Sequence, residues 1–266
     1  MPTMHQMKLA GRNTVITGAG RGIGAALAGA FHDAGANVVL ADLHGAESVA
    51  ANLDRSVGLK ADVSTEAGNV ALLAAAREAN GPIDLFFANA GVAAGTDVED
   101  TTEDDWAKSF AVNVHAHRWA AKHLLPEWLE RGEGYFCSTA SAAGLLAQIG
   151  SGPYSVTKHA AVAFAEYMSI TYGDRGINVT CLCPQGVNTE MLNAGVGATT
   201  GTNVVKAAGV VLEPEDVARA VVVAIEQEQF FVLPHPEVAH YMQLKANDPD
   251  RWLGGMRKLQ RRVKGR

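Results

Sequence analysis

Residues 13–24 read NTVITGAGRGIG, and the prediction of the fold starts from this stretch. A β-branched, apolar run comes first, and Gly18, Gly22 and Gly24 follow it at once. Glycines at a strand-to-helix turn let backbone N–H groups approach a pyrophosphate at the helix N-terminus. An acidic residue, Asp42, ends the next apolar run and is suited to a ribose diol. Glycines also occur in plain tight turns, but this order of elements favours a dinucleotide-binding βαβ unit.

Short apolar runs and alanine-rich stretches continue to alternate along the chain. Most of the runs are continuously apolar, which is typical of strands buried on both faces of a parallel sheet. The predicted strands are residues 13–18, 37–42, 56–62, 83–90, 134–139, 177–183 and 230–234. The stretches between them are long enough for helical, right-handed crossovers. We therefore expect a single α/β domain over residues 1–266, with a Rossmann-type, doubly wound parallel sheet and helices on both faces.

The composition argues against several other classes of protein. The chain has 266 residues, of which 48% are hydrophobic and 19% charged, and its net charge of −6 does not suggest a nucleic-acid partner. No run approaches the ~18 apolar residues of a membrane span, and the N-terminus lacks the apolar segment of a signal peptide. The three cysteines, Cys137, Cys181 and Cys183, fit a reducing compartment. We expect a cytoplasmic protein with no metal cluster and no membrane partner.

The order of the motifs resembles that of the short-chain dehydrogenase/reductase family. The matching motifs are TGAGRGIG at residues 17–24, ANAG at residues 88–91, Asn113, Ser141, and Tyr154 with Lys158. Ser141 precedes Tyr154 by 13 residues, which is the family's spacing. The resemblance covers roughly residues 8–235. It implies a seven-stranded sheet, a nicotinamide cofactor, alcohol oxidation or carbonyl reduction, and a homodimer or homotetramer paired through the helix that carries Tyr154.

This resemblance assigns Tyr154 as the general acid/base of the reaction. Residues four apart on a helix are neighbours, so Lys158 lies close to it. A free phenol has a pKa near 10, which is too high for a base at neutral pH. The Lys158 ammonium and the positive nicotinamide ring would each favour the phenolate. By resemblance, Lys158 also holds the nicotinamide ribose.

Two further catalytic residues follow from the resemblance. Ser141 would donate a hydrogen bond to the substrate oxygen and stabilise charge that develops there. Ser138 is the competing serine, but it lies at a strand end and outside the family spacing. Asn113 would anchor a water that relays protons to Lys158. From the residues alone, a back-bonded or exposed asparagine within a helix is the alternative.

The cofactor contacts are carried over from the family by position. They are Gly18, Gly20, Arg21, Gly22, Ile23, Gly24, Asp42, Leu43, Asp62, Val63, Asn89, Ala90, Gly91, Tyr154, Lys158, Pro184, Gly186, Val187 and Thr189. Asp62 and Val63 are expected at the adenine, although their stretch also fits the start of a helix. Gln185 occupies the usual glycine position of the Pro-Gly-x-Val-x-Thr motif and places a polar side chain near the nicotinamide.

Two residues give opposite indications about the cofactor. Arg21, within the glycine turn, can bind a 2′-phosphate in this family. The carboxylate of Asp42 would repel that phosphate and accept hydrogen bonds from the hydroxyls of NAD. Asp42 is short and held by its strand, whereas Arg21 is long enough to turn to solvent. We therefore predict that NAD is preferred over NADP by at least about tenfold.

The candidate substrate pocket contains no arginine or lysine to clamp an anion. Its predicted residues are Ala93, Ser141, Ala143, Leu145, Gln148, Gln185, Met191 and Leu192. A neutral, fairly hydrophobic secondary alcohol or ketone is the expected substrate. Residues 186–212 form a predicted substrate loop. The alternatives are an NADPH-dependent carbonyl reductase in biosynthesis and a dinucleotide-binding sensor without turnover.

A C-terminal extension over residues 236–266 departs from the family pattern, and one or two helices are expected in it. It could cover the substrate pocket or reach a neighbouring subunit. Its basic end, residues 256–266, fits either a solvated helix end or an anionic surface. His115, His117 and His159 lie near the catalytic motifs, and we interpret them as surface or packing residues.

Overall fold

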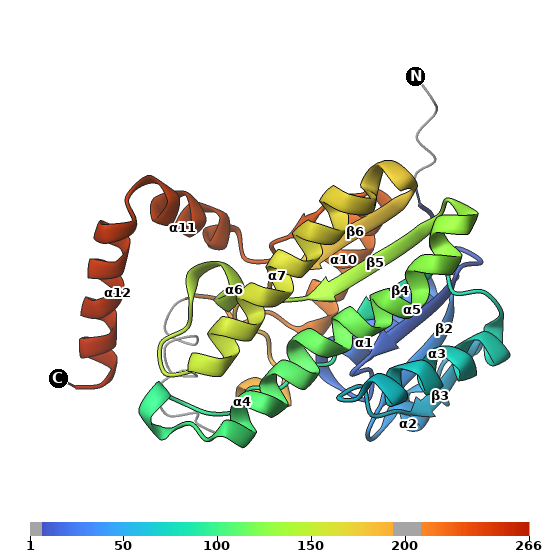
Figure 1. Ribbon diagram of the computed structural model, residues 1–266, viewed down its shortest axis with the longest axis horizontal. Helices are drawn as coiled ribbons and strands as arrows, with labels where there is room; N and C mark the ends of the chain where they lie inside the picture. Colours follow the sequence, from blue (N-terminus) through green and yellow to red (C-terminus); the bar gives the residue numbers. More distant parts are fainter. Residues whose placement is uncertain (1–6, 194–208, 266) are drawn as a thin grey trace.

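A computed structural model describes residues 7–193 and 209–265, and its centre is a parallel sheet of seven strands (Figure 1). The strands lie in the order β3-β2-β1-β4-β5-β6-β7. Their bounds are β1 Asn13–Thr17, β2 Asn37–Asp42, β3 Ser56–Lys60, β4 Leu85–Ala88, β5 Gly134–Thr139, β6 Ile177–Leu182 and β7 Phe231–Val232. The predicted fold class and the seven strands are confirmed. The strand order changes direction between β1 and β4, and ligands bind at such a switch point in open α/β sheets.

Helices cover both faces of the sheet (Figure 1). Their bounds are α1 Gly22–Asp33, α2 Ala46–Ala50, α3 Glu66–Asn80, α4 Glu103–Phe110, α5 Ala116–Arg131, α6 Ala143–Leu146, α7 Gly152–Tyr172, α8 Glu190–Asn193, α10 Pro214–Glu226, α11 Pro236–Asn247 and α12 Pro249–Val263. Short turns complete the order: η1 Val98–Asp100 and η3 Gly173–Arg175 are 3₁₀ helices, and η2 Ala111–His115 is a π-helix.

Two separate clusters of buried side chains form the core. Successive strand residues point to opposite faces, so Phe86 joins the cluster under α3, α5 and α7, whereas Phe87 joins the cluster under α1 and α10. Phe136 and Cys137 divide in the same way. This two-sided burial explains why the strands read as continuous apolar runs.

Two strands are shorter than the apolar runs from which they were predicted. The run at residues 83–90 contains the four-residue strand β4, and the run at 230–234 contains the two-residue strand β7. The remaining residues of these runs leave the ladder because they turn toward the next element. Because β4 ends at Ala88 and β6 ends at Leu182, the residues that follow them lie at the carboxyl edge of the sheet.

The C-terminal extension forms the two expected helices, α11 and α12. Each begins with a proline at its first position, where the missing N–H costs nothing. Within the described residues, none of the helices combines the length and the apolar character needed to cross a membrane. The described side chains also contain no group of three or more potential metal ligands.

Candidate active site

Most of the predicted site residues lie after the carboxyl ends of β1 to β6 or at the start of α7, and Asn113 lies in η2. The glycine turn between β1 and α1 forms one side of this region. Gly18 has a φ of +64°, and a Cβ there would lie 2.8 Å from the Cα of Ala90. A side chain is therefore excluded twice, by the backbone conformation and by the close approach of the chain after β4.

Asn89 ties three central strands together at this edge. Its amide nitrogen donates to the Thr17 carbonyl at 2.9 Å and to the Gly18 carbonyl at 3.2 Å. Its amide oxygen accepts from the Thr139 hydroxyl at 2.9 Å. The side chain thus links the ends of β1 and β5 from the end of β4, and it holds the glycine turn in place.

Asn113 lies in the π-helical turn η2, between α4 and α5. Its side chain accepts from the Val92 N–H at 2.8 Å and donates to the Val92 carbonyl at 2.9 Å and the Thr157 hydroxyl at 3.0 Å. It is fully buried, so the alternative of a back-bonded or exposed asparagine is wrong. π-turns inside helices occur frequently at functional sites.

Lys158 is buried, with 2% of its surface exposed, one helical turn after Tyr154. Its ammonium donates to the Thr139 carbonyl at 2.8 Å and forms no ion pair with any residue in the described part of the chain. Burial lowers the pKa of Lys158 to about 8. Gly91 faces it: a Cβ on Gly91 would lie 3.2 Å from the Lys158 Nζ. A side chain at Gly91 would therefore crowd the ammonium.

Tyr154 is half-buried at the start of α7, and its ring centroid is 5.6 Å from the Lys158 Nζ. Burial raises the pKa of Tyr154, while the neighbouring Ser141 hydroxyl acts in the opposite direction. Burial is the larger of these two effects on the Tyr154 pKa, and the lowering by Lys158 and the nicotinamide ring stays a prediction.

Ser141, and not Ser138, is the serine beside Tyr154. The Ser141 hydroxyl donates weakly to the Pro184 carbonyl at 3.4 Å and accepts from the Ala143 N–H at 3.1 Å. Ser138 is engaged elsewhere, because its hydroxyl forms a 3.1 Å hydrogen bond with Nδ1 of His117.

Asp42 and Arg21 lie on opposite sides of the glycine turn. One carboxylate oxygen of Asp42 accepts from the Gly20 N–H at 2.9 Å, and the other accepts from the His44 N–H at 3.3 Å. The carboxylate is thus fixed by backbone contacts. Arg21 instead forms an ion pair with Glu190 of α8. Sequence reasoning missed Glu190, which follows the predicted Thr189 directly.

The other predicted adenine-side residues differ in exposure. Leu43 is exposed. Val63 is buried in the core, and the Asp62 carboxylate accepts from the Ser64 N–H at 2.9 Å. The N-cap of α3 is Thr65, so Asp62 is not the helix cap that its sequence context allowed.

The Pro184–Thr189 segment lies against the glycine turn. A Cβ on Gly22 would lie 3.1 Å from the Thr189 side chain. The segment is supported by His235, which sequence reasoning missed. This buried side chain accepts from the Gln185 N–H at 3.2 Å and donates from Nε2 to the Gly186 carbonyl at 3.0 Å. The Gln185 Oε1 is buried and has no hydrogen-bond partner among the described residues.

The predicted pocket residues fall into three groups by exposure. Ser141 and Ala143 are buried, and Ala93, Leu145, Gln148, Gln185 and Leu192 are half-buried. Met191 is 50% exposed, so the structure does not enclose it. Residues 194–208 of the predicted substrate loop lie outside the described part of the chain.

The histidines near the site differ from one another. His117 is fully buried, and burial together with the Lys158 charge lowers its pKa to about 3. It is therefore a neutral packing residue, one of the two interpretations expected. Its Nε2 has no partner among the described residues. His159 is held by a 2.8 Å hydrogen bond to the Ser155 carbonyl.

Comparison with known proteins agrees with this arrangement. The model of the short chain dehydrogenase family matches residues 12–197. The chain is 33% identical over 204 residues to 2-keto-3-deoxy-L-fuconate dehydrogenase of Xanthomonas campestris, which covers 76% of this chain and 67% of that protein. It is 32% identical over 231 residues to meso-2,3-butanediol dehydrogenase of Serratia marcescens, covering 85% and 92%.

A solved structure is similar over nearly the whole chain. It is a short chain dehydrogenase/reductase from Burkholderia phymatum in complex with NAD, with a TM-score of 0.83 and 30% identity. The match covers 92% of this chain and 96% of that one. With the family model matched over most of the chain, this protein belongs to the short-chain dehydrogenase/reductase family of oxidoreductases.

Proposed function

We propose that the protein is an NAD-dependent dehydrogenase/reductase that interconverts a neutral, fairly hydrophobic secondary alcohol and its ketone. The observation that carries this proposal is the grouping of Ser141, Tyr154, Lys158 and Asn113 at one edge of the sheet. Lys158 is buried and has one protein acceptor, so a bound ligand could use its remaining N–H donors. The site therefore fits a nicotinamide cofactor, which when bound supplies or accepts the hydride.

Tyr154 would move the proton. In alcohol oxidation its phenolate takes the hydroxyl proton of the substrate, and in ketone reduction its phenol returns one. Burial raises the phenol pKa in the protein alone, so the phenolate needs a positive charge nearby. The Lys158 ammonium and an oxidised nicotinamide ring would provide it. Ser141 would hydrogen-bond the substrate oxygen, and Asn113 would support a water that links Lys158 to solvent.

The preference for NAD rests on Asp42 and Arg21. Asp42 is fixed by the Gly20 and His44 N–H groups, in a position where it would oppose a 2′-phosphate. The ion pair with Glu190 occupies Arg21, the residue that would otherwise bind such a phosphate. The similar Burkholderia phymatum structure contains NAD, which agrees with this preference.

The polarity of the substrate follows from the predicted pocket residues. None of the eight is charged, so they offer no clamp for a carboxylate or a phosphate. One relative acts on an uncharged secondary alcohol, meso-2,3-butanediol, according to its name, whereas another is named for an anionic keto acid, 2-keto-3-deoxy-L-fuconate. A reductase that uses NADPH and a sensor without turnover are the alternatives.

A screen of secondary alcohols and ketones with both cofactors and identified products tests the proposal. We expect NADH absorbance with NAD and neutral secondary alcohols, and a lower kcat/KM with charged hydroxy acids. Cofactor binding without turnover on the whole panel would favour the sensor. Faster turnover with NADPH and ketones would favour the biosynthetic reductase.

The surface of α7 supports a homodimer or homotetramer. Val156, Ala163, Tyr167 and Ile170 are exposed at helical spacing along it, and Ile170 is 84% exposed. An apolar stripe of this kind on a small-residue helix suits close packing against a second copy. Light scattering at micromolar concentration should give at least twice the 27.9 kDa monomer mass, and a monomer would reject the proposal.

We further propose that residues 1–266 form one domain and that the protein acts in the cytoplasm. The three cysteines are free and buried, which suits a reducing compartment. Limited proteolysis and fractionation of the source cells would test these two points.

A further inference from the structure

Polar contacts attach the C-terminal extension, and His235 just before it, to the rest of the protein. The His235 ring accepts from the Gln185 N–H and donates to the Gly186 carbonyl. Lys245 of α11 donates to the Leu145 carbonyl at 2.5 Å, and Lys264, just after α12, forms an ion pair with Asp97. Figure 1 shows α12 standing away from the sheet, on the side of α6 and the beginning of α7. The extension is thus held beside the segment that leads to Tyr154.

A cavity of about 270 Å³ lies between α12 and this segment. Its inner wall is the chain from Leu146 to Gly152, and its outer wall is α12. The apolar lining residues are Val98, Leu146, Ile149, Trp252, Leu253 and Met256. Pockets for a whole drug-sized ligand usually have ~300–1,000 Å³, so this cavity is large enough for part of a ligand.

The lining favours an uncharged, apolar group. Asp97 is the one charged lining residue, and Lys264 neutralises it. The predicted pocket residue Gln148 also lines the cavity, and its backbone N–H donates to the Ser155 hydroxyl at 2.8 Å. Ser155 is the neighbour of Tyr154 on α7. The cavity wall is therefore continuous with the first turn of the helix that carries the candidate acid/base.

The cavity wall also contains an unusual backbone conformation. Ala147 has a φ of +64° and a ψ of 151°, in a region that residues other than glycine rarely occupy. Such strain costs on the order of 1–3 kcal/mol and is found most often at ligand-binding sites and active sites. Val98 is 71% exposed and Leu253 is 50% exposed, so apolar side chains also lie at the solvent side of the cavity.

We propose that this cavity is a subsite for the apolar tail of the substrate, and that Trp252 and Met256 determine specificity for tail length. The proposal rests on the proposed alcohol/ketone chemistry at Tyr154 and adds a substrate class to it. The substrate is a secondary alcohol or ketone with an uncharged hydrocarbon tail. The reacting carbon lies at Tyr154, and the tail extends along residues 146–152 to α12.

The first test measures kcat/KM with NAD for 2-butanol, 2-pentanol, 2-hexanol, 2-heptanol and 2-octanol. Burial of each further methylene in the cavity should raise kcat/KM about threefold to fourfold, which corresponds to ~0.8 kcal/mol. Trp252→Ala and Met256→Gln should flatten this dependence. Both positions lie on α12, which has no buried residue, so the core should fold normally in both variants. Leu244→Ala, an exposed leucine on α11, is the matched control and should keep the wild-type slope.

The second test needs no turnover. Calorimetric titration in the presence of NAD should give at least about tenfold tighter binding of 2-octanone than of 2-butanone, and Trp252→Ala should remove most of that difference. Turnover with a flat dependence on chain length, or equal binding of the two ketones, would overturn the subsite. If no alcohol is oxidised but the Trp252-dependent preference for 2-octanone remains, the subsite stands and the proposed redox function fails.

Discussion

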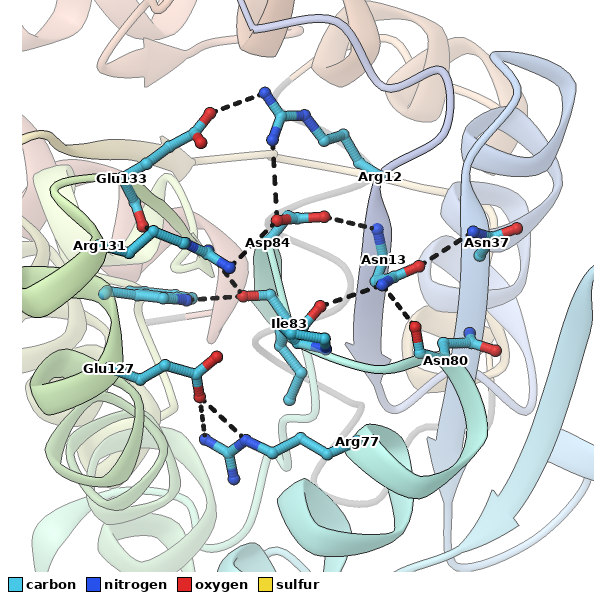
Figure 2. Close-up of polar contacts among 12 residues, drawn as sticks. Arg12, Asn13, Asn37, Arg77, Asn80, Ile83, Asp84, Glu127, Arg131 and Glu133 are labelled. Carbon is cyan, nitrogen blue, oxygen red and sulfur yellow. Dashed lines mark hydrogen bonds and ion pairs between the residues drawn. The ribbon is translucent and has the colours of Figure 1, made fainter.

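The two edges of the sheet differ in whether a buried or half-buried charged side chain has an ion-pair partner, as Asp84 and Lys158 show. At the amino edge, where the strands begin, the charged side chains are paired (Figure 2). Asp84 lies 3.7 Å from Arg12 and 3.4 Å from Arg131, and it accepts from the Asn13 N–H at 2.9 Å. At the carboxyl edge, Lys158 is buried with no ion-pair partner among the described residues. Paired groups hold elements together, whereas a buried unpaired charge lowers stability.

The amino edge also joins helices to one another and to the residues just before β4. Trp128 of α5 donates from its indole N–H to the Ile83 carbonyl at 2.8 Å, and Arg131 donates to the same carbonyl at 3.0 Å. Arg77 and Glu127 link α3 to α5 at 3.0 Å (Figure 2). The difference suggests that the amino edge stabilises the fold, and that the carboxyl edge retains unsatisfied groups for a ligand. Natural proteins commonly trade stability for function in this way.

The largest expected effect is the loss of turnover in Tyr154→Phe. This change removes the transferable proton and keeps the ring, so kcat should fall about 10²- to 10⁴-fold. The thermal shift produced by NAD should remain, because the core is unchanged. Tyr167→Phe, an exposed tyrosine on the same helix, is the control and should keep full activity. Near-wild-type turnover in Tyr154→Phe would remove Tyr154 from the mechanism.

Lys158→Met should abolish activity and yet raise stability at pH 7. The pKa of Lys158 falls from 10.5 to about 8 on folding, which corresponds to a cost on the order of 3 kcal/mol for the buried ammonium. We expect a gain of roughly 1–3 kcal/mol in the free energy of unfolding, measured by urea denaturation. A variant that is less stable than wild type at pH 7 would show that the buried charge does not lower the free energy of unfolding.

The stability difference between Lys158→Met and wild type should also change with pH in a defined direction. Between pH of about 8 and 10.5, unfolded Lys158 binds more protons than folded Lys158. The stability contributed by this group in the wild-type protein therefore rises with pH across that window. The advantage of Lys158→Met over wild type should shrink from pH 7 to pH 10. A constant difference would contradict the lowered pKa.

Asp84→Ala should have the opposite effects to Lys158→Met, because it should lower the stability and leave the activity unchanged. It leaves Arg12, Arg131 and the Asn13 N–H without their shared acceptor, at a cost of about 1–3 kcal/mol. The urea midpoint should fall, while kcat and KM at 25 °C stay close to wild type. Asp174→Ala, at an exposed aspartate in η3, should leave both stability and activity unchanged. A large loss of kcat in Asp84→Ala would contradict the proposal that the amino edge serves stability and the carboxyl edge serves function.

The smallest expected effect concerns cofactor choice. We expect kcat/KM to favour NAD over NADP by at least about tenfold, or ~1.4 kcal/mol, and Asp42→Ala should narrow or reverse this ratio. Adding Glu190→Gln should shift the ratio further toward NADP, because Arg21 then loses its carboxylate partner. Asp33→Ala, at an exposed carboxylate at the end of α1, should keep the ratio. Equal kcat/KM for the two cofactors in the unmodified protein would refute the argument.

Much of the fold and part of the site follow from short stretches of sequence. The continuous apolar runs predict all seven strands, because a strand buried on both faces needs no alternation. Helical spacing predicts that Tyr154 and Lys158 are neighbours, and the structure places them so. The choice of Ser141 over Ser138 follows from the spacing in the family that the chain resembles, and Ser141 is the serine beside Tyr154. The strands and the Tyr154–Lys158 pair depend on local backbone and burial preferences.

Other features were decided only by the tertiary structure. Arg21 meets Glu190 across 169 positions of the chain, and His235 meets Gln185 across 50. Nothing in the sequence around Asn113 predicts its π-turn or its contacts with Val92. The cavity beside Trp252 is likewise formed by three separate segments, residues 97–98, 146–152 and 252–260. Local preferences determine which elements form, but such contacts depend on how the packed helices and the sheet bring distant side chains together.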